Sequence, residues 1–582
     1  MHSIDIIIIA IYFIISFSIA LYLSGRSGRS TEDFFLSGRK LPWWIAGTTM
    51  VATTFAADTP LSVTELVAKN GISGNWLWWN FVAGNILTVF FFAKLWRRAN
   101  VLTDVEFVEI RYSGKEAAFL RGFKSLYLGI FMNIIIMGWV NIALKDILTA
   151  MFGIEESYVI FILFGAMILV GVYSALSGLW GIAFTDMFQF IIAMGGCIFL
   201  AYHVLSLPQV GGIAGLKKAL PESAFSFIPS IKSILSNGSV EKAGASKSMT
   251  LSLWSFLALL LMPWWASWYP GSEPGGGGYV AQRMMSAKNE SHSLKATLWF
   301  TIAHYALRPW PWILVALASL VLFPGLSNPR MGFVLTMKQY LPVGFLGLLI
   351  AAFLAAYMST ISTQLNWGTS YVVNDFYKRF IQTGKSEKHY IIISRIITLI
   401  LVLFSCGITL IMNSISGAWE FIINCGAGLG LVLILRWYWW RINAWSEIVA
   451  MIAPFIAYSI NVFFIKLPTP VSLFFIVPFT TVSWLIATFV TKPVDKNVLI
   501  AFVNRVNPGG KGWSVLQNEV DVPASKDSLG SLFINWILGT ILVYSSLFAI
   551  GNFIFQDYTP AIILTAIVVI ISFIFHKRLK EV

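Results

Sequence analysis

The chain has 582 residues, of which 57% are hydrophobic and only 12% charged, and its mean hydropathy is +0.76. A soluble protein of this length carries roughly twice that charged fraction, so the composition excludes an ordinary soluble domain. It predicts an all-α polytopic membrane protein. The net charge of +13 requires no nucleic acid partner, because Lys and Arg gather in alternate connections between the apolar segments.

About fifteen apolar stretches are long enough to be predicted as transmembrane helices. In chain order they cover 4–23, 43–66, 74–95, 124–145, 157–177, 181–204, 251–282, 295–322, 343–376, 389–413, 418–437, 443–465, 471–490, 532–552 and 558–576.

The distribution of basic residues predicts the orientation. Residues 1–5 lack the positive region of a cleavable signal peptide, and basic residues come only after the first apolar run, which places the N-terminus outside. The connections that are then cytoplasmic, with the C-terminal tail, hold 28 of the 40 Lys and Arg, and the outside connections hold 10. The sequence therefore predicts a multi-pass protein of the cell (plasma or inner) membrane with a cytoplasmic C-terminus.

Two connections are long, and neither is predicted to be a separate domain. Residues 205–250 form an outside loop rich in Ser, Gly and Lys, and residues 491–531 form a cytoplasmic loop expected to consist of turns and linker. The charged and apolar residues from Arg97 to Ser125 alternate at helical spacing, which predicts short helices on the cytoplasmic surface.

The most informative stretch is 350–375, which is apolar yet dense in hydroxyl side chains. At about 100° per residue, Ala356, Ser359, Thr360 and Thr363 share one helix face. Hydroxyls in hydrocarbon are costly unless they find partners, so this face is expected to meet protein, water or an ion. One interpretation is that the hydroxyls bond back to the preceding turn and let helices pack closely. The other is a site for a small hard cation such as sodium.

Two predicted spans are interrupted. The second contains several threonines followed by Asp58, Thr59 and Pro60, and the seventh contains three prolines and the glycines 275–278. Unwound backbone is tolerated at membrane depth only where it lines a cavity or is buried in protein. These spans open two successive blocks of five, about 43–204 and 251–437, and an odd number of spans gives the blocks opposite orientations. This layout predicts an inverted-repeat transporter; the alternative for the seventh span is two shorter helices around an outside loop.

Five segments together resemble the sodium:solute symporter family over roughly residues 1–440. They are STEDFFLSGRKLPWW (30–44), GTTMVATTFAADT (47–59), GLWGIAFTDMFQ (178–189), YVAQRMMSAKN (279–289) and AAYMSTISTQLN (355–366). The resemblance implies a LeuT-like core of two inverted five-helix repeats, at 43–204 and 251–437. Around it, 1–42 supplies an additional helix and cytoplasmic loop, 205–250 an extracellular loop, and 438–582 additional helices.

The resemblance also implies sodium as the coupling ion and suggests which residues hold it. One site would use the carbonyls of Ala52, Phe55 and Ala356 and the hydroxyls of Ser359 and Thr360. Some family members bind a second sodium ion, whose ligands here would be Asp186, Ser359, Ser362 and Thr363. Asp186 has an alternative role as a helix cap together with Thr185.

The solute-binding residues follow less directly from the resemblance. The candidates are Asp58, Thr59, Glu273, Gly275 and Arg308. Thr59 replaces a sugar-binding glutamine of sugar symporters, and the residues preceding YVAQR also depart from the sugar-binding pattern, which argues against a hexose. Arg308 could clamp a carboxylate in a bidentate manner, or pair with Glu273 or Asp58 and brace the bundle.

The predicted function is sodium-coupled symport of a small organic solute into the cell by alternating access. The partners implied are that solute and the lipid bilayer, with no obligatory protein partner. An enzyme is not expected, because the six histidines are scattered without metal spacing or a nucleophile–base pair. Two alternatives remain: a carrier driven by protons or exchange, in which Asp186 or Asp58 would titrate, and a transporter-like sensor.

Overall fold

The computed structural model describes residues 2–27, 30–153, 155–232, 250–412, 421–520, 522 and 528–578. These residues are mostly helical, as predicted, and the only strands among them, β1 (Ser230–Lys232) and β2 (Thr250–Ser252), have three residues each and pair in parallel. Within the described ranges, eleven helices are long and apolar enough to cross a membrane, and the apolar helices Ser3–Ile19, Leu253–Ala266 and Leu429–Tyr438 are shorter.

The first quarter of the chain forms helices that follow the predicted spans closely. They are α1 (Ser3–Ser27), α2 (Thr31–Leu36), η1 (Ser37–Arg39), α3 (Trp43–Thr53), α4 (Asp58–Asn70), η2 (Ile72–Asn75), α5 (Trp76–Trp79), α6 (Val82–Leu87), η3 (Thr88–Phe92), α7 (Ala93–Ala99), α8 (Phe107–Arg111), α9 (Gly114–Leu126), η4 (Tyr127–Met132) and α10 (Asn133–Phe152). The second predicted span is broken between α3 and α4, at residues 54–57. The expected short helices between Arg97 and Ser125 are α8 and α9.

The fifth and sixth predicted spans are joined in α11 (Glu156–Leu205), which bends at Gly178. Gly178 has φ 54° and ψ −168°, a conformation that only glycine adopts without strain. The connection that follows α11 contains α12 (Gly212–Ala219), η5 (Glu222–Phe225) and the two strands.

The middle of the chain contains the second break. Its helices are α13 (Leu253–Leu261), α14 (Pro263–Ala266), α15 (Gly278–Ser286), α16 (Glu290–Ile302), η6 (Ala303–Leu307), α17 (Pro309–Leu322), α18 (Met331–Tyr340), α19 (Phe345–Ser370), η7 (Tyr371–Ile381), α20 (Glu387–Ile411) and α22 (Leu429–Tyr438). Residues 267–277 are not helical, because Gly271, Gly275 and Gly276 all have positive φ. The Cβ of any other residue at Gly271 would lie 1.9 Å from the Tyr279 hydroxyl.

The remaining helices lie beyond the second block: α23 (Ala444–Ile460), η8 (Asn461–Ile465), α24 (Leu473–Val490), α25 (Lys496–Val506), η9 (Lys511–Leu516), α26 (Leu529–Ile554) and α27 (Tyr558–Arg578). The loop 491–531 contains more structure than the expected turns and linker. The amphipathic helix α25 forms there, starts at the Asp495 cap, and packs Phe502 edge-on against Phe107.

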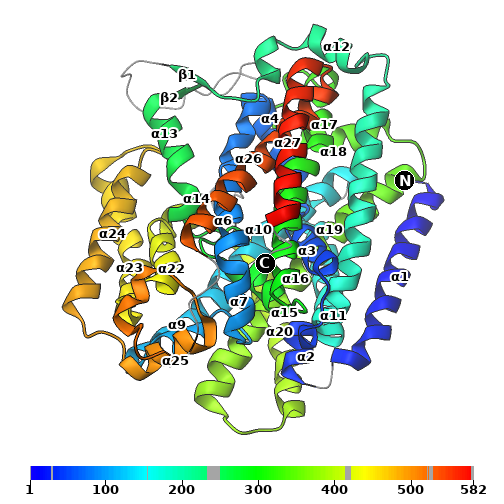
Figure 1. Ribbon diagram of the computed structural model, residues 1–582. Helices are drawn as coiled ribbons and strands as arrows, with labels where there is room; N and C mark the ends of the chain where they lie inside the picture. Colours follow the sequence, from blue (N-terminus) through cyan, green and yellow to red (C-terminus); the bar gives the residue numbers. More distant parts are fainter. Residues whose placement is uncertain are drawn as a thin grey trace.

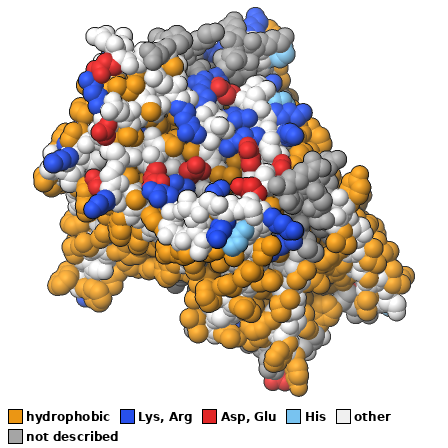
Figure 2. Space-filling model, turned by 90° about the horizontal axis from the view of Figure 1, so that it is seen from below, with side chains coloured by type: hydrophobic (Ala, Val, Ile, Leu, Met, Phe, Trp, Pro, Cys, Tyr) orange, Lys and Arg blue, Asp and Glu red, His pale blue; other side chains and the backbone are white. Residues whose placement is uncertain are grey.

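Helix α19 lies at the centre of the bundle, in contact with α3, α10, α11 and α20. In Figure 1, α1 stands at one edge of the molecule and α23 and α24 at the opposite edge. Nearly every residue of α19 from Leu349 to Ser370 is buried, so its polar face meets protein rather than lipid. Figure 2 views the molecule from below, the end where Figure 1 shows α2 and α25, and charged side chains of both signs gather on that surface within a hydrophobic border.

Candidate functional site

The hydroxyl face of α19 lies against the end of α3. The Thr360 hydroxyl donates hydrogen bonds to the carbonyl of Thr53 (2.9 Å) and to that of Ala356, one turn earlier (3.1 Å). Thr53 Oγ1 lies 3.0 Å from Thr363 Oγ1 and donates to the Thr49 carbonyl. Helix α3 therefore ends where α19 carries its hydroxyls, and the break after Thr53 exposes backbone oxygens to the same space.

A small cavity, too tight to hold a water molecule in this conformation, lies between the end of α3, α11 and α19 at this level. Four of the five residues predicted for the first sodium site line it, namely Ala52, Phe55, Ala356 and Ser359, together with Gln189, Phe190 and Ala193 of α11. Ser359 is 1% exposed, and its hydroxyl has no hydrogen-bond partner within the described ranges. Buried hydroxyls are rarely left unpaired, so this oxygen is suited to a ligand.

Thr360, the fifth predicted residue, lies beside the cavity residues on α19. Its hydroxyl hydrogen is used in the bonds to Thr53 and Ala356, but its oxygen lone pairs remain able to coordinate a cation. The donor set is thus one of hard neutral oxygens, which fits a small monovalent cation.

The residues predicted for a second sodium ion form an adjoining network. Thr49 donates a short hydrogen bond to one oxygen of Asp186, and the other oxygen has no hydrogen-bond partner in the part of the chain that is described. Ser359 lies near this carboxyl, outside hydrogen-bonding geometry. The Ser362 hydroxyl donates to the carbonyl of Ser359 at 3.1 Å. Asp186 does not lie at the start of a helix, since α11 continues unbroken from Leu179, so it is not a helix cap.

Arg283 also belongs to this network, and it was not among the site residues predicted from the sequence. It lies fully buried on α15, donates to Thr363 Oγ1 (2.8 Å) and Gln282 Oε1 (2.7 Å), and is the nearest opposite charge to Asp186. The only available signal was its place within YVAQRMM, on the half-helix that follows the glycine run.

The predicted solute residues separate into two groups. The first surrounds the break between α3 and α4. Arg308 donates to Thr54 Oγ1 (3.0 Å) and the Val51 carbonyl (3.3 Å), and its guanidinium is the electrostatic partner of Asp58. Asp58 Oδ1 has no hydrogen-bond partner among the described residues, and Thr59 beside it is half-buried. The geometry favours the bracing role for Arg308.

His304 belongs to this first group and was not predicted. Its Nδ1 lies 2.9 Å from Thr54 Oγ1, and its Nε2 lies 3.2 Å from an Arg308 nitrogen. The ring also packs edge-on against Trp78. Its place inside the predicted span 295–322 can be read from the sequence, but these contacts cannot be inferred from spacing.

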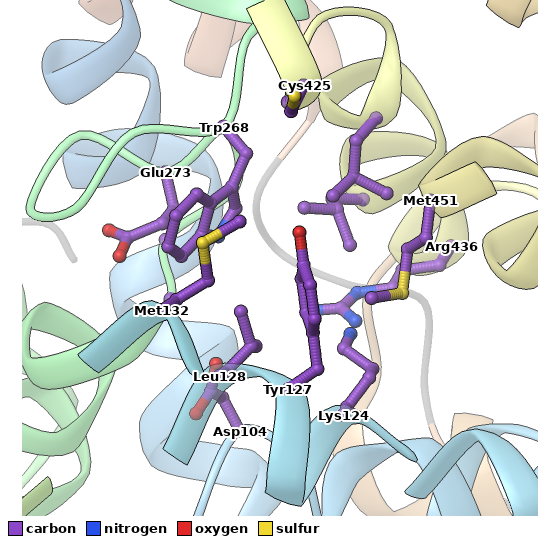
Figure 3. Close-up of a pocket in the computed structure, with 15 residues that line it drawn as sticks. Asp104, Lys124, Tyr127, Leu128, Met132, Trp268, Glu273, Cys425, Arg436 and Met451 are labelled. Carbon is purple, nitrogen blue, oxygen red and sulfur yellow. The ribbon is translucent and has the colours of Figure 1, made fainter. Parts of the chain in front are cut away.

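The second group lies in the unwound segment before α15. Glu273 lines a small cavity of about 30 Å³, which Figure 3 shows between the unwound segment, η4 and the residues around Cys425. The Gly275 carbonyl accepts a hydrogen bond from Trp96 Nε1 (2.9 Å). Asp58, Thr59 and Arg308 thus lie at one break and Glu273 and Gly275 at the other. The two breaks meet at Gly271, where an added Cβ would lie 3.4 Å from Thr54 Cγ2.

A bundle of apolar helices with two broken segments that meet buried polar groups defines a membrane transporter. The family comparison agrees with this class. The model of the sodium:solute symporter family matches residues 34–453, and the chain belongs to this family. Membership confirms the resemblance predicted from the five sequence segments, and with it sodium-coupled symport as the function.

Individual relatives support the same assignment. The chain is 26% identical over 497 residues to a sodium/glucose cotransporter of Vibrio parahaemolyticus, covering 80% of this chain and 86% of the relative. It is 25% identical to sodium/glucose cotransporter 1 of Oryctolagus cuniculus, covering 76% and 69%. In structure it matches a Na⁺-coupled sialic acid symporter in its substrate-bound outward-open state, with a TM-score of 0.68, 19% identity and coverage of 85% and 99%, which shows the shared fold.

Proposed function

We propose that this symporter binds its coupling sodium ion in the small cavity between α3, α11 and α19. The observation that carries the proposal is the buried, unpartnered hydroxyl of Ser359, in a cavity that Ala52, Phe55 and Ala356 also line. Thr360 supplies the fifth oxygen. The ion would join the end of α3 to α19, two elements that belong to different five-helix blocks.

The architecture that we propose has fifteen membrane crossings and two inverted repeats, 43–204 and 251–437, with the N-terminus outside, in the cell membrane. Its support is the matched position of the two breaks, which open both blocks: residues 54–57 between α3 and α4, and residues 267–277 between α14 and α15. Repeats of opposite orientation place such breaks at a shared site near the midplane. Residues 1–42 and 438–582 would flank this core.

Sodium binding would favour the conformation in which α3 and α19 are held together. By linkage, the solute then raises sodium affinity by the same factor by which sodium raises solute affinity. An inside-negative potential contributes about 2.3 kcal/mol per charge per 100 mV to inward movement. The solute, a small organic molecule, would enter with the ion.

We also propose a second, conditional role for the network around Asp186. Its unpartnered oxygen, with Ser359, Ser362 and Thr363 nearby, supports a second sodium ion. The same buried carboxyl supports proton coupling if sodium proves dispensable. Asp186→Asn should therefore change the stoichiometry or release of sodium, and an unchanged sodium dependence would remove the second site.

The test of the first site is equilibrium binding of ²²Na⁺ to purified protein. Ser359→Ala should weaken binding at least about tenfold, because it removes one ligand oxygen from a desolvated ion, and Thr360→Ala should behave alike. Ser370→Ala is the matched control, since its buried hydroxyl on the same helix bonds back to the Trp367 carbonyl. Wild-type affinity in Ser359→Ala, or equal loss in Ser370→Ala, would contradict the site.

A further inference from the structure

The cavity beside Glu273 has an unusual distribution of charge. In Figure 3, Glu273 and Asp104 lie on one side of it, and Lys124 and Arg436 lie on the other. Trp268, Tyr127 and Met132 lie between the two sides and form part of an apolar wall. Its volume in this conformation is about 30 Å³, so a ligand would enter only when the cavity widens; charged groups facing one another across apolar walls are the arrangement that orients such a ligand.

On the acidic side, one carboxyl oxygen of Glu273 accepts no hydrogen bond from the described residues. Glu273 is 3% exposed, one of its carboxyl oxygens accepts the Gly271 amide (3.1 Å), and Oε1 has no hydrogen-bond partner among the described residues. Asp104 is satisfied by the Gly278 amide and by a short hydrogen bond from Tyr371. Two buried carboxyls that are electrostatic neighbours favour a cationic partner for the free oxygen.

On the basic side, the Nε–H group of Arg436 donates no hydrogen bond in the part of the chain that is described. Arg436 and Lys124 both pair with Glu447, at 3.1 and 2.9 Å, so one carboxylate serves two cations. Arg436 is 2% exposed, and its Nε has no hydrogen-bond partner within the described ranges. A buried guanidinium with a free N–H favours an anionic acceptor.

We propose that the solute is a small zwitterion, whose ammonium group is bound by Glu273 beside Asp104 and whose anionic group is bound by Arg436 beside Lys124. This inference rests on the proposed function, because it takes the cavity as the solute site of the symporter. Each charged end of such a solute meets an unpartnered buried atom, and its carbon skeleton meets the Trp268 and Tyr127 rings. A neutral hexose supplies neither charge.

The test uses solutes that differ only in charge. Purified protein in saturating sodium is incubated with glycine, β-alanine, γ-aminobutyrate or proline, each compared with the matching acid that lacks the amine and the matching amine that lacks the carboxylate. Glucose is added as the neutral sugar. Binding is measured as slower alkylation of Cys425, which lines the cavity, in a Cys197→Ala/Cys406→Ala background.

At least one zwitterion should slow Cys425 alkylation about fivefold or more, and its two singly charged analogues should have little effect. Glu273→Gln should weaken that protection at least about tenfold, since a neutral amide loses the charge-assisted bond to the ammonium. Glu65→Gln is the matched control, because Glu65 lies on α4 outside the cavity and pairs with Lys69. Protection by glucose or by the singly charged acids, protection by no zwitterion, or unreactive Cys425 would each overturn the inference.

Sodium-dependent thermal stabilisation of the same variants separates this inference from the proposed function. Glu273→Gln should keep the wild-type sodium response, which also shows that it is folded. If sodium stabilises the protein while the zwitterions fail, only the solute class is wrong. If sodium has no effect on wild type, the proposed function fails, and the zwitterion inference that rests on it falls as well.

Discussion

At the residue scale, the buried guanidinium of Arg283 ties α15 to the hydroxyl face of α19 through its hydrogen bond to Thr363, and it is an electrostatic neighbour of the buried Asp186 on α11. Removing one partner of a buried ion pair leaves an uncompensated charge and typically costs about 3–5 kcal/mol. Arg283→Gln should therefore lower the free energy of unfolding by this amount, measured by denaturant titration in detergent.

The double variant Arg283→Gln/Asp186→Asn distinguishes a charge effect from lost packing. If the pair matters through charge, the double variant should recover at least half of the loss, because neither group is then charged and unpaired. Simple addition of the two single losses would mean that the residues stabilise the protein independently.

The site could be predicted from the sequence only where polar groups interrupt an apolar run. Ser359 and Thr360 are conspicuous for that reason, and the structure places them at the end of α3. Arg283 was missed because an Arg near a predicted cytoplasmic connection has an ordinary explanation in charge bias. Its burial depends on how α15 packs against α19, which no local pattern reveals.

At the element scale, the bend in α11 depends on one glycine. Gly178 has φ 54° and ψ −168°, so Gly178→Ala should cost about 1–3 kcal/mol of unfolding free energy. Gly165→Ala in the same helix is the control: nothing lies within 4 Å of a Cβ there, and alanine should be neutral or stabilising by up to about 1 kcal/mol. Thermal or denaturant unfolding of both variants measures the difference. An equal effect at the two sites would contradict a special role for the bend.

The broken elements were predictable, and α25 was not. Glycines and prolines inside an apolar span are strong signals, because regular helix cannot continue through 275–278. Helix α25 lies between a proline and a Pro-Gly-Gly turn, signals that suggested a linker. Its helical state depends on burying Leu499 and Phe502 against the bundle, a tertiary contact that outweighs the local composition.

At the scale of the whole molecule, an ion-pair network connects the first block to the second. Glu109 pairs with Arg379 (3.0 Å) and Arg121 (2.6 Å), and Arg121 also pairs with Asp375 (2.7 Å). Burial opposes the charged form of Glu109, but the hydrogen bonds from Arg379 and Arg121 outweigh it and hold the pKa of Glu109 below its usual value. The network is therefore intact at neutral pH and is lost only as the pH falls below the usual glutamate range.

These pairs join α8 and α9 to η7, so an opening between these elements would have to separate them. Arg379→Gln should raise the alkylation rate of Cys425 from that side about fivefold, which corresponds to about 1 kcal/mol in the opening equilibrium. Lys378→Gln is the matched control, because Lys378 pairs with Glu387 and lies over the Tyr390 ring, outside the network. Equal rates in both variants would mean that the network does not control access.

Sodium coupling at this cavity can be tested by the thermal stability of the purified full-length protein in sodium, potassium or choline at equal ionic strength. The melting temperature should rise with the logarithm of the sodium concentration above the dissociation constant, because the ion binds only the folded state. Ser359→Ala should abolish the rise and Ser370→Ala should keep it. Equal stability in all three cations, or a shift that follows pH instead, would contradict sodium coupling at this cavity.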